Sequence, residues 1–172
     1  EAIAGGSSEA LEKRMAALRK AWKTSRDSDF CDNMYEYFSL LRPELKTERS
    51  KLKVRYDKEL ADHVENLEQK DGKGLELQAV TFSGIAEAFE TLGDYYFASQ
   101  SWLLAGACVN ETHRGDDADL DRAADFYGKC IEARKKVDLK DRWYIEAKAL
   151  HDSLVARGFG TKEADPAADV GG

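Results

Sequence analysis

The scarcity of proline limits what this chain can fold into more than any other feature of its sequence. Between Pro43 and Pro166 the chain contains no proline, and alanine, leucine, glutamate and lysine together far outnumber the β-branched residues. Those four residue types favour helices, whereas β-branched residues favour strands. No stretch alternates apolar and polar side chains convincingly at period two. The sequence therefore predicts an all-α fold of about seven antiparallel helices with short connections.

Apolar spacing and turn residues divide the first part of the chain into three expected helices. After a flexible lead-in at 1–7, we expect helices over 8–26 and 30–41. Pro43 ends or kinks the second of these, because proline fits the first turn of a helix but not its interior. A long charged helix over 44–70 then carries a narrow apolar stripe, so most of its circumference should face water. The stripe consists of Leu45, Leu52, Tyr56, Leu60, Val64 and Leu67.

The second part of the chain is expected to form helical hairpins. The sequence DGKG at 71–74 predicts a helix stop followed by a turn. The expected helices run from Leu75 into the aromatic stretch that follows, and then over about 100–112, 119–137 and 141–157. Three regions result, namely an N-terminal helical region over 8–70, helical hairpins over 75–158, and a disordered tail or linker over 159–172.

The aromatic stretch 86–109 is expected to form the inside of a helical hairpin rather than a ligand pocket. Glycine costs a helix about 1 kcal/mol relative to alanine, so we interpret Gly93 as a point where another helix approaches closely. Ala105 on the next helix is small enough to admit a bulky neighbour. The residues that recur at helical spacing around Gly93 are Ile85, Phe89, Leu92 and Tyr96.

The same stretch resembles the tetratricopeptide repeat. The matching positions are Phe89-x2-Leu92-Gly93-x2-Tyr96, followed by Trp102-x2-Ala105. The family pairs two helices in a unit of 34 residues, so the match covers about a fifth of the chain. Thr112 and Asp117 depart from the pattern, because they stand where the repeat has its closing alanine and proline. The resemblance implies helical hairpins that bind another protein or a peptide.

A second copy of the repeat has two conflicting registers after residue 115. Ala124, Tyr127, Gly128 and Ile131 repeat the first-helix positions at a spacing of 35 residues. The pattern Ala123-x3-Tyr127-x2-Cys130 instead resembles the second helix of a pair. Both registers cannot hold, and the sequence leaves the choice open.

The resemblance also implies a binding face. In the repeat family the first helix of each pair lines a concave groove, and those positions fall here on Glu87, Glu90, Asp94 and Phe97. The four residues share one helical stripe by spacing, offset from the expected core stripe. Three carboxylates beside one aromatic ring favour a partner with lysine or arginine next to an apolar anchor. The alternative is an ordinary solvated acidic face.

Residue types that carry chemistry are present without the spacing that chemistry requires. The three cysteines, Cys31, Cys108 and Cys130, form no metal-binding spacing and are expected to be small buried hydrophobes. Cys108 and His113 fall on different helical faces, which disfavours covalent catalysis. The acidic run 117–121 lacks the glycine and glutamate of a calcium loop. We therefore expect no cofactor, no metal site and no enzymatic activity.

Charge limits the classes of partner. A net charge of −7 disfavours binding to nucleic acid or to an anionic membrane. The longest apolar run, 102–109, is far shorter than the roughly 20 residues that span a bilayer. A basic stripe on the long charged helix would suit an acidic partner, although interspersed acids also fit a plain solvated face. The stripe consists of Arg42, Lys46, Arg49 and Lys53.

These observations together favour a non-catalytic helical scaffold that binds a protein or peptide carrying basic residues. One alternative is a structural helical domain appended to a larger enzyme or receptor, where it positions that enzyme or receptor or mediates self-association. Another is a small enzyme with no recognisable motif. The chain begins with Glu1 rather than methionine, which suggests a processed or excised piece. The compartment, cytoplasmic or exported, stays open.

Overall fold

Helices make up all of the regular secondary structure in the part of the chain that the structure describes. The computed structural model describes Lys13 and residues 43–113 and 116–160. Over these residues the chain forms five long α-helices and one short 3-10 helix, and no strand. They are η1 (Pro43–Leu45), α4 (Lys46–Gln69), α5 (Gly72–Thr91), α6 (Tyr95–Thr112), α7 (Asp117–Lys136) and α8 (Arg142–Ala156).

The all-α expectation is confirmed for these residues. The expected lead-in at 1–7, the helices over 8–26 and 30–41, and the tail from 161 onward lie outside the described residues. The total of about seven helices therefore stays a prediction.

The chain divides into two compact units, Glu1–Lys51 and Leu52–Gly172. The division falls within α4. The reason is packing, because Tyr56 of α4 lies between the next two helices. Its ring centroid is 6.2 Å from that of Phe89 in α5 and 5.6 Å from that of Phe97 in α6. Its hydroxyl donates to Gln100 Oε1 at 2.7 Å.

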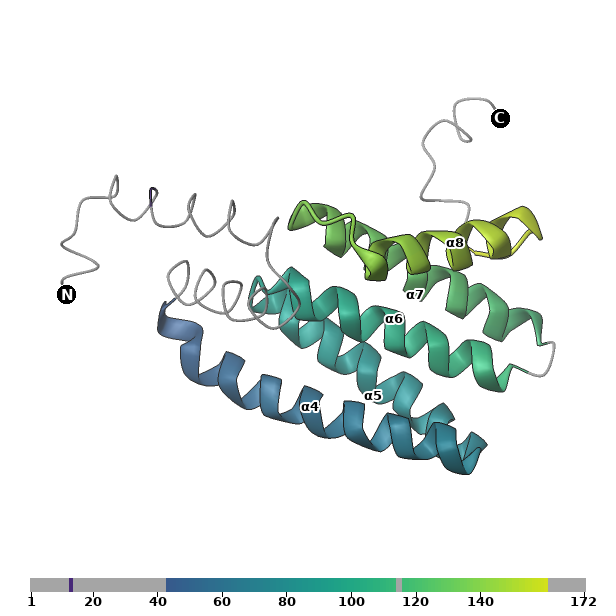
Figure 1. Ribbon diagram of the computed structural model, residues 1–172, viewed down its shortest axis with the longest axis horizontal. Coiled ribbons are helices and arrows are strands. Elements are labelled where there is room, and N and C mark those ends of the chain that lie inside the picture. Colours follow the sequence, from purple (N-terminus) through teal and green to yellow (C-terminus); the bar gives the residue numbers. More distant parts are fainter. Residues whose placement is uncertain (1–12, 14–42, 114–115, 161–172) are drawn as a thin grey trace. The chain divides into compact units, whose positions relative to one another are not determined.

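Within the second unit α5 packs against α6, α6 against α7, and α7 against α8 (Figure 1). The central helix is α6, which contacts α5, α7 and α8 and also receives Tyr56 from α4. Burial on several sides explains why its sequence is nearly continuously apolar or small rather than amphipathic. The buried residues of α6 run without interruption from Tyr96 to Gly106.

The connection between α5 and α6 corrects the prediction for Gly93. Gly93 has φ +78° and follows Leu92, the C-cap residue of α5. Its N–H donates to Glu90 O, and the N–H of Asp94 donates to Phe89 O, both at 2.9 Å. This pair of bonds is a Schellman motif, which glycine favours because it has no Cβ. Gly93 is therefore not a helix contact, and a Cβ added there meets nothing within 4 Å.

Asp94 begins the next helix at once. Its carboxylate accepts a hydrogen bond from the N–H of Phe97 at 3.3 Å and so caps α6. The fifth expected helix consequently begins at Tyr95 rather than near Gln100. Phe89 and Tyr96, which were expected on a single helix, lie on α5 and α6 respectively.

The turn at the DGKG sequence is also shorter than expected. Asp71 caps α5 by accepting from the N–H of Gly74 at 3.0 Å. The two glycines therefore lie in the first turn of α5, which begins at Gly72 rather than at Leu75. Lys70 supplies the left-handed residue at the end of α4, with φ 54°.

Gly106 marks a close approach of α6 and α7 that the apolar spacing of the sequence does not indicate. A Cβ built on Gly106 would lie 2.6 Å from Cε1 of Tyr127 on α7. Tyr127 is itself buried, with 1% of its surface exposed. Ala105, which was expected at such a position, is fully buried. The close contact is thus displaced by one residue along α6.

The chain beyond α8 returns to α7. Gly158, with φ +94°, ends α8 in another Schellman turn. The N–H of Gly160 donates to Asp121 Oδ1 at 2.9 Å. Residues 159 and 160, which were expected to begin a disordered tail, therefore contact the folded unit.

Candidate functional site

The buried side chains that could take part in chemistry are instead engaged in contacts that hold the helices together. The guanidinium of Arg134 is fully buried and bonds Asp141 through two nitrogens. A third nitrogen donates to Tyr96 O at 3.1 Å and to Ser99 Oγ at 2.7 Å. Arg134 thereby joins the end of α7 to the beginnings of α6 and α8. Because its donors are occupied, we assign it an architectural role.

A cysteine and a histidine meet in the core, although not the pair considered from the sequence. Cys108 Sγ lies 3.4 Å from Nδ1 of His63, which α4 carries 45 residues away. Burial raises the pKa of the Cys108 thiol to about 12, and burial also lowers the pKa of His63. A thiolate, not a thiol, is the nucleophile. The contact therefore joins two neutral groups and does not resemble an activated cysteine.

The apolar stripe expected on the long helix is rotated in the structure. Leu52, Tyr56 and His63 of α4 are buried, whereas Val64 and Leu67 are 51% and 42% exposed. His63 lies seven residues after Tyr56, so it shares the same helical face. That spacing is the signal in the sequence that identifies His63 as a core residue.

The four residues proposed as a binding stripe do not form one exposed face. Glu87 is exposed, and the carboxylate of Glu90 accepts from Trp102 Nε1 at 2.8 Å. Asp94 is 1% exposed and Phe97 is 4% exposed. The prediction that these residues share one helical stripe is wrong, because α5 ends before Asp94. Asp94 instead caps α6, and Phe97 lies in the buried part of α6.

The basic stripe is also not an open cationic row. Arg42 lies outside the described residues, Lys46 is exposed and Arg49 is buried. Lys53 is bonded to Asp57 at 2.7 Å and lies 5.1 Å from the centroid of the Phe97 ring. The charge of Lys53 is thus paired within the protein itself.

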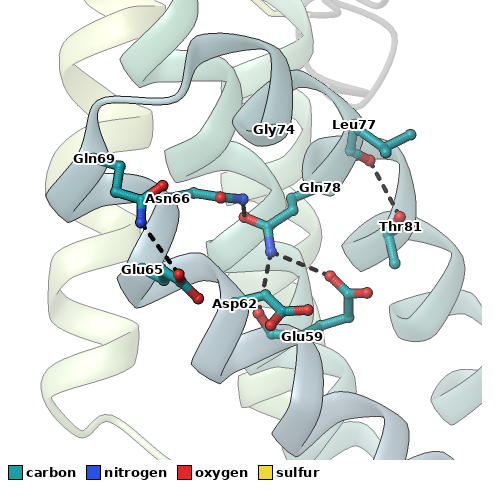
Figure 2. A pocket seen from close by; sticks show the side chains of 9 residues that line it. All are labelled: Glu59, Asp62, Glu65, Asn66, Gln69, Gly74, Leu77, Gln78 and Thr81. Carbon is teal, nitrogen blue, oxygen red and sulfur yellow. Dashed lines mark hydrogen bonds between the residues drawn. The ribbon is translucent and has the colours of Figure 1, made fainter.

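A groove between α4 and α5 is the candidate binding site (Figure 2). It encloses about 300 Å³ and opens to solvent. From α4 it is lined by Glu59, Asp62, Glu65, Asn66 and Gln69. From α5 it is lined by Gly74, Leu77, Gln78 and Thr81. From the sequence alone, these α4 residues belong only to the water-facing side of a charged helix.

Gln78 fixes the floor of the groove. Its side chain is 4% exposed and accepts a hydrogen bond from Asn66 Nδ2 at 3.0 Å. Its amide nitrogen donates to both the backbone oxygen and the carboxylate of Glu59, at 3.2 Å each. Figure 2 shows this side chain reaching from α5 to α4 between the groove residues. The bonds hold the Glu59 carboxylate at a defined place in the wall.

The groove is acidic without internal compensation. No lysine or arginine lines it. Among the described residues, the ion pairs involve neither Glu59 nor Asp62 nor Glu65. Three carboxylates in one partly enclosed groove create a negative potential that attracts a cationic group.

Exposed aliphatic side chains adjoin the carboxylates. Leu77 lines the groove and is 68% exposed, and Val80, three residues further along α5, is 62% exposed. From Gly74 the same side of α5 continues through uncharged residues at helical spacing. These residues are Leu77, Thr81, Gly84 and Ala88. The groove therefore has one acidic wall and one uncharged, partly aliphatic wall.

Comparisons with protein-family models, with curated proteins and with solved structures find no match to this chain. The likeness to the tetratricopeptide repeat accordingly stays a prediction. None of the described helices has both the length and the apolar composition needed to cross a membrane. Over the same residues, no group of three or more histidine, cysteine or acidic side chains is arranged to hold a metal ion.

Proposed function

We propose that this protein is a non-catalytic helical scaffold that binds another protein or a peptide carrying basic residues. The observation that carries the proposal is the α4–α5 groove, in which carboxylates without an ion-pair partner among the described residues lie beside the exposed aliphatic side chain of Leu77. Mixed acidic and apolar surfaces of this kind suit partners that present lysine or arginine next to an apolar anchor. The groove takes the place of the stripe containing Glu87 that the sequence suggested.

The rigidity of the surrounding helices supports the same proposal. The groove walls are two helices joined by a capped connection, and Gln78 crosses between them. A surface that is already ordered loses less conformational entropy when a partner binds. The helical-repeat character of the chain is part of this proposal and stays a prediction.

A display selection on the folded full chain tests the function. We expect a library of random helical and extended peptides to yield binders that saturate and that compete with one another for one site. Selection against an unrelated acidic helical protein of similar size removes peptides that bind by net charge alone. Failure to obtain any saturable binder would contradict the proposed function.

Sedimentation analysis separates this function from self-association. A scaffold for other partners is expected to sediment with a coefficient that does not depend on its own concentration in the micromolar range. A coefficient that rises with concentration, and returns to the monomer value when Leu77→Ser and Val80→Ser are combined, would favour self-association through this face.

A further inference from the structure

We infer that the α4–α5 groove receives an amphipathic helix of a partner protein, with a lysine or arginine against the acidic wall and an aliphatic side chain on Leu77 and Val80. The inference rests on the proposed function and specifies the chemistry of its partner. It follows from the length, charge and shape of the two groove walls.

The acidic wall has the length of a short helix. Glu59, Asp62, Glu65 and Gln69 recur along one side of α4 and all line the groove. Ten residues separate the first from the last, which corresponds to about 15 Å at 1.5 Å per residue. A partner helix of about three turns lying along this wall would pass all three carboxylates. Lysine or arginine residues three or four positions apart on such a helix would repeat at the same spacing as the carboxylates on α4.

The position of the carboxylates favours a cation more than an open surface would. Glu59 and Asp62 are half-buried. Partial enclosure lowers the effective dielectric constant and strengthens attraction to an opposite charge. Glu59 is also held by Gln78, so a cation meets a carboxylate that is already in place. A guanidinium or ammonium group can therefore bind with a small loss of side-chain entropy.

The second wall admits a helix at close range. Gly84 and Ala88 are small, and a Cβ added to Gly84 meets nothing within 4 Å, whereas the side chains of Asp71 and Asn66 already occupy the space beside Gly74. Small residues allow the side chains of a facing helix to enter the space between them. Leu77 lines the groove, Val80 lies three residues further along α5, and both remain more than half exposed. Burial of two such side chains would supply the apolar part of the affinity.

A helix fits this site better than the other occupants. The described residues contain no strand whose edge could pair with an extended peptide. Nucleic acid and acidic peptides would meet the carboxylates of Glu59, Asp62 and Glu65 with like charge. A second copy using the same face would oppose acidic wall to acidic wall, because a two-fold interface repeats the same patch on both partners.

A designed peptide serves as the probe. It is an alanine-based helix of about 18 residues, long enough to be substantially helical in water, with two arginines and two leucines on one face. One matched peptide replaces both arginines by glutamates, and another replaces both leucines by alanines. Binding to the full chain is measured by fluorescence anisotropy, and the contact is mapped by amide chemical shifts. We expect saturable binding of the probe alone and shift changes centred on Asp62, Asn66, Leu77 and Thr81.

Paired charge reversals test the site. Asp62→Lys with Glu65→Lys is expected to weaken probe binding at least about tenfold, because attractive contacts are replaced by repulsive ones. Glu132→Lys with Asp152→Lys changes the net charge equally at exposed positions on α7 and α8, outside the groove, and should alter binding by less than about twofold. Thermal unfolding of both variants verifies that each remains folded. Combining Leu77→Ser with Val80→Ser should also weaken probe binding, and this variant leaves the net charge unchanged.

The possible results separate the two proposals. Equal weakening by both charge reversals, or chemical-shift changes outside α4 and α5, overturns the groove assignment. If the probe fails to bind while display-selected peptides bind elsewhere, the inference is wrong and the scaffold function stands. If neither the probe nor any selected peptide binds, the proposed function itself fails.

Discussion

Gly106 and Tyr127 show how a single residue sets the distance between two helices. The ring of Tyr127 occupies the space that a side chain on residue 106 would need, and it is buried too deeply to move aside. Glycine at this position therefore costs helix propensity but allows α6 and α7 to pack closely. Gly84 on α5 is in the opposite situation, since a Cβ added there meets nothing within 4 Å.

Alanine substitutions at these two glycines should change stability in opposite directions. We expect Gly106→Ala to reduce the free energy of unfolding by about 1–3 kcal/mol through overpacking. Gly84→Ala should increase it by up to about 1 kcal/mol, because alanine favours the helix and finds open space. Urea denaturation of both variants measures the difference. A stabilised Gly106→Ala variant would show that α6 and α7 are not in close contact there.

His63 gives stability a dependence on pH. Burial lowers its pKa in the folded state from the reference value of 6.5, so the unfolded chain binds the proton more readily. Stability from the neutral imidazole is present above pH 6.5 and is lost as the pH falls below that value. We expect the free energy of unfolding to decrease between about pH 6.5 and 5, above the range in which most carboxylates titrate. His63→Gln should flatten this slope, and an unchanged slope would assign it to other groups.

At the scale of helices, the ends were harder to predict than the interiors. The residues Phe89 to Tyr96 have helical spacing, but the spacing continues across a break at Leu92-Gly93-Asp94. The connection is so short that the apolar period survives it, and a single glycine is both a tolerated helix residue and a stop signal. Long helical segments were predicted well because periodicity is a property of many residues, whereas a stop depends on one backbone angle.

The candidate site could be predicted only in part, because it depends on how two helices pack rather than on one helix alone. The expectation of a basic partner rested on Glu87, Glu90 and Asp94, and two of those side chains are used by the fold. The groove residues come from two helices, and their alignment depends on how α4 packs against α5. Hydrophobic spacing along one helix cannot specify that alignment. Asp62 and Leu77 are ordinary surface residues in the sequence and become a site only through packing.

Two helix C-termini with a residue at positive φ predict a second pair of substitutions with opposite effects on stability. Lys70 ends α4 with φ 54°, a conformation that strains residues other than glycine. Lys70→Gly should therefore stabilise the protein by about 0.5–1 kcal/mol. Gly93→Ala places the same strain at φ +78° and should destabilise by about 1–2 kcal/mol. Thermal unfolding at neutral pH measures both changes. Destabilisation by Lys70→Gly would indicate a side-chain contact worth more than the strain.

Across the molecule, burial is greatest in α6 and declines toward α8. All residues of α6 from Tyr96 to Gly106 are buried, whereas only Ala147 and Leu154 are buried in α8. Local unfolding is easiest where few apolar groups are packed. The carboxyl-terminal helix is thus held more by Arg134, which bonds the capping residue Asp141, than by an apolar face of its own.

Amide hydrogen exchange on the Arg134→Leu variant tests this arrangement. Loss of a buried ion pair commonly costs 3–5 kcal/mol, and the partial exposure of Asp141 lets water replace some of the lost bonding, so we expect about 2–4 kcal/mol. Protection should fall first and furthest in α8, because the lost bonds include those to its cap, while the centre of α6 keeps the slowest exchange. Lys148→Ala removes an exposed pair with Asp152 on the same helix and should change stability by less than about 0.5 kcal/mol. Uniform loss of protection in α6 and α8 would mean that the unit opens only as a whole and that Arg134 does not selectively anchor its last helix.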